Sequence, residues 1–236
     1  MISLSAEVVK GFDALDVLSA VWFIACWLGY TVYAKRMSLK CRCLASIMAD
    51  HRVAWMECLL TRDNRVADAS LLANLERNVS FFASSTLLVL AGLIAALGSG
   101  EDILKVAGNL PFNLAVSEHA WEAKLLFLAA MFVYAFFKFS WSLRQYGFAS
   151  VLVGRAPGIG VFKQAEVKQF SEHAAKVISR AAHAYNLGLR SYYFSLAYLV
   201  WFLNPWMFML ASSWVVGVLY RREFRSNVLK ALDRVV

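Results

Sequence analysis

Residues 74–98 read NLERNVSFFASSTLLVLAGLIAALG, and this stretch decides the fold class of the chain. It begins with polar side chains and then carries no charge between Val79 and Leu97. About twenty such residues, at a helical rise of about 1.5 Å each, cross the roughly 30 Å hydrocarbon layer of a bilayer. The stretch therefore predicts a transmembrane helix over about residues 79–98.

Small residues recur at four-residue spacing on this span, at Ala91, Gly92, Ala95 and Ala96. Small side chains let the backbone of a second helix come close, in a solvent where the hydrophobic effect does not drive helices together. We expect this face to pack against another helix.

The composition of the whole chain agrees with a membrane protein. Apolar residues make up 60% of the sequence and charged residues only 17%, outside the range of soluble domains. The formal charge of +8 fits cytoplasmic loops beside anionic lipid headgroups better than a nucleic-acid partner. The four cysteines form neither a CxxC pair nor a secreted disulfide framework, so we expect reduced thiols.

Three further apolar runs predict spans at about 15–34, 124–146 and 195–220. The first run starts acidic and is stopped by Lys35 and Arg36, which favours a retained anchor over a cleaved signal peptide. The segment after the second span, residues 99–123, carries few cations and predicts an external loop with a short surface helix at about 103–107. We therefore predict an all-α polytopic membrane protein, one membrane domain over 1–236 with four transmembrane helices.

Two basic segments predict the cytoplasmic side. Segment 35–78 carries eight cations, so the N-terminus is expected outside; they are Lys35, Arg36, Lys40, Arg42, Arg52, Arg62, Arg65 and Arg77. Apolar residues from Leu44 to Leu59 recur at helical spacing and predict an amphipathic helix. From Val66 the same spacing runs on into the second span, so we expect the second and third helices to extend into the cytosol.

The second cytoplasmic segment, 154–190, begins with a hinge at Gly154–Gly160 that contains Pro157. Beyond it, an apolar stripe from Val167 to Tyr185 predicts another amphipathic helix, with lysines and Arg180 away from the stripe. We expect the stripe to pack either on the 44–59 helix or on a neighbouring subunit.

The last apolar run, 191–220, is interrupted by Asn204 and Pro205. Proline removes a helical hydrogen bond, so the favoured interpretation is one long kinked helix that leaves the C-terminus outside. The alternative is a re-entrant hairpin that turns at Asn204 and Pro205 and returns the terminal cations to the cytosol.

Two cations, Lys138 and Arg144, interrupt the third span. Either their side chains snorkel to the headgroups, or they meet Glu76, Asp68 or Asp63 in a polar girdle. The candidate residues for a polar path, or for contact with lipid or an anion, are Asn74, Arg77, Asn78, Ser84, Ser85, Lys138, Arg144 and Asn204.

No catalytic motif accompanies these residues: the sequence has no P-loop, GxGxxG, HExxH or GxSxG pattern. His173 and His183 are too far apart for the i, i+4 spacing of a helical metal pair. We therefore expect no enzyme activity, no metal and no cofactor. A membrane enzyme acting on lipid would need a group such as Glu76 or Cys58.

Two sequence blocks resemble a family of four-span membrane proteins known as domain of unknown function five-nine-nine, shared by bacteria and plants. The blocks are Leu75-Glu76-Arg77-Asn78 with Phe81–Thr86, and Leu189–Phe194 leading to Leu199–Pro205. The family pattern has Gly before the proline, where this chain has Asn204. The resemblance covers nearly the whole chain and implies four spans with long loops, but no catalytic residues.

Two functions of different class remain. The favoured one is a homo-oligomeric scaffold or lipid-binding accessory protein of the inner (plasma) membrane, with anionic lipids as partners on the cytoplasmic side. The alternative is an oligomeric channel or transporter-like conduit for a small ion, with selectivity for anions expected because cations lie near the proposed path.

Overall fold

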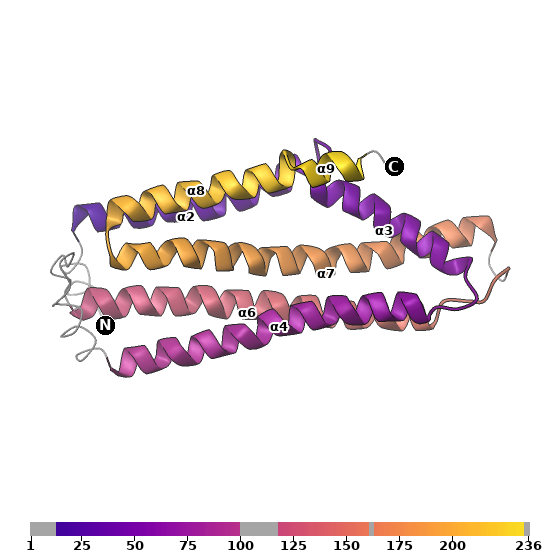
Figure 1. The fold of residues 1–236 in the computed structure, drawn as a ribbon, viewed down its shortest axis with the longest axis horizontal. Helices are drawn as coiled ribbons and strands as arrows, with labels where there is room; N and C mark the ends of the chain where they lie inside the picture. Colours follow the sequence, from indigo (N-terminus) through magenta and orange to yellow (C-terminus); the bar gives the residue numbers. More distant parts are fainter. Residues whose placement is uncertain (1–12, 100–117, 161–162, 234–236) are drawn as a thin grey trace. The chain divides into compact units, whose positions relative to one another are not determined.

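The structure is a computed structural model, which describes residues 13–99, 118–160 and 163–233. Within these ranges the secondary structure is entirely helical, which confirms the all-α prediction. The elements, shown in Figure 1, are α2 (Ala14–Met37), α3 (Leu44–Leu60), α4 (Val66–Gly98), α6 (Glu118–Gly154), α7 (Gln164–Leu199), a short 3₁₀ turn (Val200–Phe202), α8 (Pro205–Phe224) and α9 (Asn227–Leu232). The surface helix expected at 103–107 lies outside the described residues.

Among the described helices, three are long and apolar enough to cross a membrane: α2, α4 and α6 from His119 onward. α4 extends from Val66 to Gly98, as the helical spacing predicts, and Asn64 begins it by accepting a hydrogen bond from the Val66 amide at 2.9 Å.

The chain forms two compact units. Unit 1 contains segments 1–36, 86–135 and 190–220, and unit 2 contains segments 37–85, 136–189 and 221–236. The long helices α4, α6 and α7 are divided between the two units, and the last residues of α2 and α8 also belong to unit 2.

Aromatic rings fill the core of unit 1. Phe23 of α2 lies 5.8 Å from Phe194 and 5.5 Å from Tyr198, both on α7, and 5.1 Å from Phe208 on α8, measured between ring centroids. All four of these side chains are 1% exposed or less. Aromatic pairs at such separations add favourable edge contacts to the burial of large apolar areas.

The contacts of α2 reveal how the chain turns between α7 and α8. Trp201, directly after α7, reaches Asp16, and Arg190 of α7 lies over the Tyr30 ring, so α7 runs antiparallel to α2. On α8, Phe208 packs on Phe23 and Tyr220 on Tyr33, so α8 runs parallel to α2. The two helices therefore form an antiparallel hairpin, visible in Figure 1.

This hairpin replaces the favoured interpretation of 191–220 as one kinked helix, which is wrong. α7 begins at Gln164, passes Arg190 without a break and ends at Leu199, before Asn204 and Pro205. Asn204 Oδ1 accepts hydrogen bonds from the Trp206 and Met207 amides, at 2.8 and 3.3 Å, and Pro205 is the first residue of α8. Asparagine and proline in this order start a new helix.

In unit 2, α7 packs against α6. Ala174, Ile178 and Ala181 of the predicted stripe are buried, and Ser142 of α6 donates a hydrogen bond to the Ala181 carbonyl at 2.7 Å. α6 was neither of the two expected partners, although α3 also approaches α7 through the Arg52–Ser179 hydrogen bond at 3.5 Å. Burial lowers the pKa of the Arg52 guanidinium.

The end of the chain also belongs to unit 2 and lies on α3. Arg42 pairs with Asp233 at 3.2 Å, the Ala45 amide donates to Glu223 at 3.1 Å, and His51 Nε2 lies 3.4 Å from the Leu232 carbonyl. The C-terminal helix α9 and the segment that follows α2 are therefore held together within unit 2.

Candidate functional site

A buried ion pair joins three helices of unit 1. Lys124 of α6 is 4% exposed and donates from Nζ to Asp16 Oδ1 of α2 at 3.1 Å. The Trp201 indole Nε1 donates to the same oxygen at 2.7 Å, and the ammonium lies 4.6 Å from the centroid of that indole. An ion pair in so apolar a place is stable only when further hydrogen bonds and a polarisable ring support both charges.

A cavity of about 210 Å³ lies beside this ion pair. Its lining comes from α2, α6, α7 and the 3₁₀ turn after α7: Ala20, Phe23, Ile24, Ala123, Lys124, Phe127, Tyr198 and Trp201. The Tyr198 hydroxyl donates to the Lys124 carbonyl at 3.1 Å, so it is engaged within the wall. The cavity therefore presents mainly carbon surfaces.

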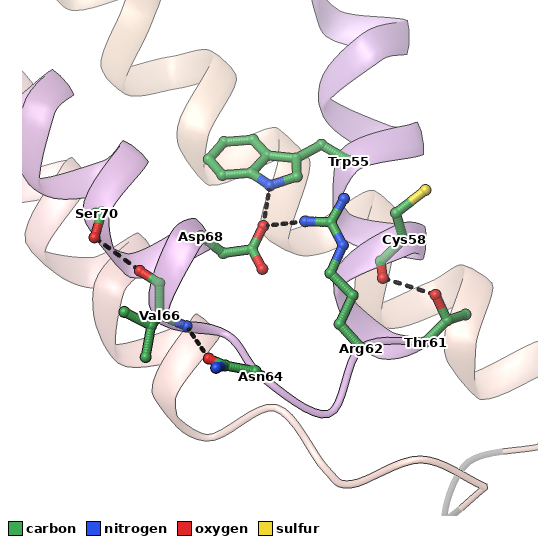
Figure 2. Close-up of polar contacts among 8 residues, drawn as sticks. All are labelled: Trp55, Cys58, Thr61, Arg62, Asn64, Val66, Asp68 and Ser70. Carbon is green, nitrogen blue, oxygen red and sulfur yellow. Dashed lines mark hydrogen bonds and ion pairs between the residues drawn. The ribbon is translucent and has the colours of Figure 1, made fainter.

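A second buried carboxylate, Asp68, lies near the start of α4 in unit 2 (Figure 2). Its side chain is fully buried, and Oδ1 accepts hydrogen bonds from Trp55 Nε1 and Arg62 Nη1, both at 2.7 Å. Oδ2 is buried without a hydrogen-bond partner among the described residues. This cluster fastens the end of α3 to the start of α4.

Arg65 ties the same connection to the predicted hinge. Its guanidinium donates to the carbonyls of Ala156 and Pro157, directly after the end of α6 at Gly154. Gly160 of the hinge has a φ of 77°, a left-handed conformation that favours glycine. The hinge is thus held by a side chain from the α3–α4 connection.

Most residues predicted for a polar path lie on the outside of α4 rather than around a channel within one chain. Asn74, Arg77, Asn78 and Ser84 are exposed, and the half-buried Ser85 donates its hydroxyl to the Phe81 carbonyl at 2.8 Å. Asn204 instead caps α8.

The predicted charge partners are found in other contacts. Asp68 pairs with Arg62, Glu76 accepts a hydrogen bond from Ser150 at 2.9 Å, and Asp63 is exposed. Arg144 is exposed with its guanidinium 5.7 Å from the Phe148 ring centroid, and Lys138 is half-buried.

The small-residue face of α4 is not covered by the described part of the chain. Ala91, Gly92 and Ala95 are exposed and Ala96 is half-buried. A Cβ placed on Gly92 meets no atom of the described residues within 4 Å. The helix contact expected for this face is therefore not made within the described part of the chain.

Sequence reasoning missed Asp16, Lys124 and Trp201 as members of one site. Asp16 and Lys124 lie at the predicted starts of the first and third spans, 15–34 and 124–146. A usable signal was present, because an acid and a cation at the same ends of two parallel spans, the first and the third, meet at one depth. In the described ranges, no three His, Cys, Asp or Glu side chains come together as a metal site.

Comparison with known proteins adds the family. No curated protein and no solved structure matches the chain. The model of the family described as "Protein of unknown function, DUF599" matches residues 18–228, nearly the whole chain. This protein therefore belongs to the DUF599 family.

Proposed function

We propose that this protein is a non-catalytic scaffold of the inner membrane, which assembles with copies of itself through α4 and binds anionic lipids with its cytoplasmic unit. The observation that carries the proposal is the outward face of α4, where polar and small residues are exposed along a helix apolar enough to span a membrane. A second helix can pack closely against such a face and form hydrogen bonds with it, whereas lipid tails form no hydrogen bonds.

The polar part of this face comprises Arg77, Asn78 and Ser84, and the small part Ala91, Gly92 and Ala95. Polar side chains gain hydrogen bonds when they meet a second helix in the hydrocarbon layer. Small residues allow the close backbone approach that such contacts need. A second copy of α4 offers both features at matching depth.

The hairpin supports a topology that differs from the expected one. Contacts with Asp16 and Tyr33, near the two ends of α2, indicate that the hairpin covers the same depth as α2. We infer five crossings, with the N-terminus outside and the C-terminus inside, rather than four crossings with the C-terminus outside. The terminal cations Arg221, Arg222, Arg225, Lys230 and Arg234 then satisfy the positive-inside rule.

Cations of unit 2 provide the lipid-binding surface. Lys168, Lys176 and Arg180 are exposed on α7, and Arg221 and Arg222 are exposed at the end of α8. α4 and α6, at about 50 and 55 Å by helical rise, exceed the roughly 30 Å hydrocarbon layer, so their unit 2 ends project towards the headgroups and cytosol. Near an anionic leaflet, each such cation contributes about 1 kcal/mol of attraction.

Oxidative cross-linking tests the self-assembly. In a cysteine-free background, Gly92→Cys is expected to give a covalent dimer in native membranes. Leu126→Cys, at an exposed position of another membrane helix, is the matched control and should stay monomeric. Equal cross-linking at both positions, or none at Gly92→Cys, would contradict the proposed self-assembly through α4.

Co-purified lipid tests the second part. Mass spectrometry of gently solubilised protein should show anionic lipids enriched over the bulk membrane, and Lys176→Glu with Arg180→Glu should reduce the enrichment. A lipid profile equal to the membrane average argues against the proposal. Fusions to the C-terminus and to the α3–α4 connection should report the same compartment.

The exposed positions of Asn78 and Ser84 also favour an alternative, an ion conduit between neighbouring copies of α4. In liposomes, such a conduit gives halide or potassium flux that Asn78→Ala and Lys138→Ala reduce. Flux no greater than that of protein-free vesicles ends this alternative and leaves the scaffold.

A further inference from the structure

We propose that the cavity of unit 1 is a binding site for one acyl chain of a membrane phospholipid. The site is separate from the α4 face and from the basic surface of unit 2, so it does not depend on the proposed function. It is built by residues of α2 and α6, by Tyr198 of α7 and by Trp201 of the following 3₁₀ turn; the α2 and α6 residues are Ala20, Phe23, Ile24, Ala123, Lys124 and Phe127.

The chemistry of the wall selects a hydrocarbon. The polar atoms of the wall already have hydrogen-bond partners in the protein. Lys124 Nζ and Trp201 Nε1 both donate to Asp16, and the Tyr198 hydroxyl donates to the Lys124 carbonyl. The surfaces that remain for a ligand are aromatic rings, alanine methyls and the Ile24 side chain. A bound water needs two to four polar partners, whereas an apolar wall favours an apolar occupant.

The size of the cavity fits part of an alkyl chain. At about 210 Å³ it exceeds the roughly 150 Å³ of an engineered apolar cavity that binds benzene. Several methylene groups fill such a volume. Each methylene that moves from loosely packed surroundings into the cavity gains dispersion contacts with the aromatic rings.

The rim indicates where the occupant comes from. Ile24 is 40% exposed and Phe127 is 38% exposed, and both lie on helices apolar enough to span a membrane. Ile24 is ten residues into α2, about 15 Å from its start. At that depth the surroundings are phospholipid acyl chains, which are present there at a far higher concentration than any free apolar molecule.

The inner wall provides a specific readout. Phe23 is 1% exposed and Tyr198 is 0% exposed, so lipid that merely surrounds the protein does not reach them. Full-length protein in nanodiscs that contain a phospholipid with a diazirine on its acyl chain is irradiated, and the labelled residues are mapped by mass spectrometry. We expect label on Phe23 or Tyr198, in addition to the exposed residues.

Cavity-filling variants make the test decisive. Ala123→Leu and Ala20→Leu place side-chain atoms in the cavity from two different walls. Each variant should reduce the label on Phe23 and Tyr198 about ten-fold, which is the loss of affinity expected when about two methylenes of the acyl chain are displaced. Ala130→Leu, at an exposed position of α6, is the matched control and should leave the label unchanged.

Three outcomes overturn the proposal: no label on Phe23 or Tyr198 in the parent, undiminished label in both folded cavity-filling variants, or an equal loss in Ala130→Leu. A parallel arm uses a free fatty acid with the same diazirine. Label from the free acid but not from the phospholipid would assign the cavity to a free amphiphile and refute the phospholipid. Cross-linking at α4 is unaffected by any of these outcomes, so the two proposals fail separately.

Discussion

The Trp201 indole donates a hydrogen bond to the Asp16 carboxylate over 2.7 Å, across 185 residues of sequence. This contact places the end of α7 at the beginning of α2 and so positions the turn of the α7–α8 hairpin. The same carboxylate oxygen also contacts Lys124, and one acidic residue of α2 thus links α6 to the 3₁₀ turn that follows α7.

Removing either charge of the Asp16–Lys124 pair should destabilise unit 1 strongly. Asp16→Asn takes away the carboxylate that the buried ammonium contacts, and we expect a loss of about 3–5 kcal/mol in the free energy of unfolding. The double variant Asp16→Asn with Lys124→Met should recover at least about half of that loss, because no buried charge remains. Unfolding in mixed micelles measures both. A double variant less stable than either single one contradicts this account.

The Asp68–Arg62 pair should behave asymmetrically, because Asp68 is fully buried while the Arg62 side chain is 46% exposed. Arg62→Ala leaves a buried carboxylate with only the Trp55 indole, whereas Asp68→Asn leaves a guanidinium that water can solvate. We expect Arg62→Ala to cost more than Asp68→Asn, by about 1–2 kcal/mol. Proteolysis of the α3–α4 connection, compared at increasing denaturant, reports the difference. Equal susceptibility would show that water reaches Asp68.

Loss of the Asn204 cap should weaken the hairpin turn. Asn204→Ala removes the acceptor for the Trp206 and Met207 amides and is expected to cost about 1 kcal/mol, whereas Asn204→Ser keeps an acceptor. Asn204→Gly should cost only a few tenths of a kcal/mol. Melting temperatures in detergent rank the three variants, and an alanine variant as stable as the serine variant would exclude a capping role.

Gly188 should be intolerant of any side chain. A Cβ at this position would lie 2.5 Å from Cε1 of Phe139, so α6 and α7 approach closely here. We expect Gly188→Ala to destabilise unit 2 by about 1–3 kcal/mol, despite alanine's better helix propensity. Phe139→Leu in the same chain should relieve part of the cost.

Gly147→Ala is the matched control for this helix pair, since a Cβ on Gly147 meets nothing within 4 Å among the described residues. The control should be neutral or stabilised by up to about 1 kcal/mol. Similar melting temperatures for the two glycine variants would show that α6 and α7 separate easily.

The sequence alone determined the membrane class and the helices. Uninterrupted apolar runs, as in 79–98, and helical spacing from Val66 onward are local properties, because hydrocarbon forces each spanning segment to satisfy its own backbone hydrogen bonds. The start of α4 at Val66 likewise followed from the helical spacing of its apolar residues.

Tertiary structure alone decided how the helices pair. Asn204 and Pro205 suit both a kink and a helix start, and only the contacts of α2 with both α7 and α8 distinguish the two. Likewise Asp68 and Glu76 have several cations within sequence reach, and packing selects Arg62 for the first and the Ser150 hydroxyl for the second. In a bilayer, hydrophobicity is satisfied by lipid as well as by protein, so which helices meet depends on close packing and on a few buried polar contacts between residues far apart in sequence.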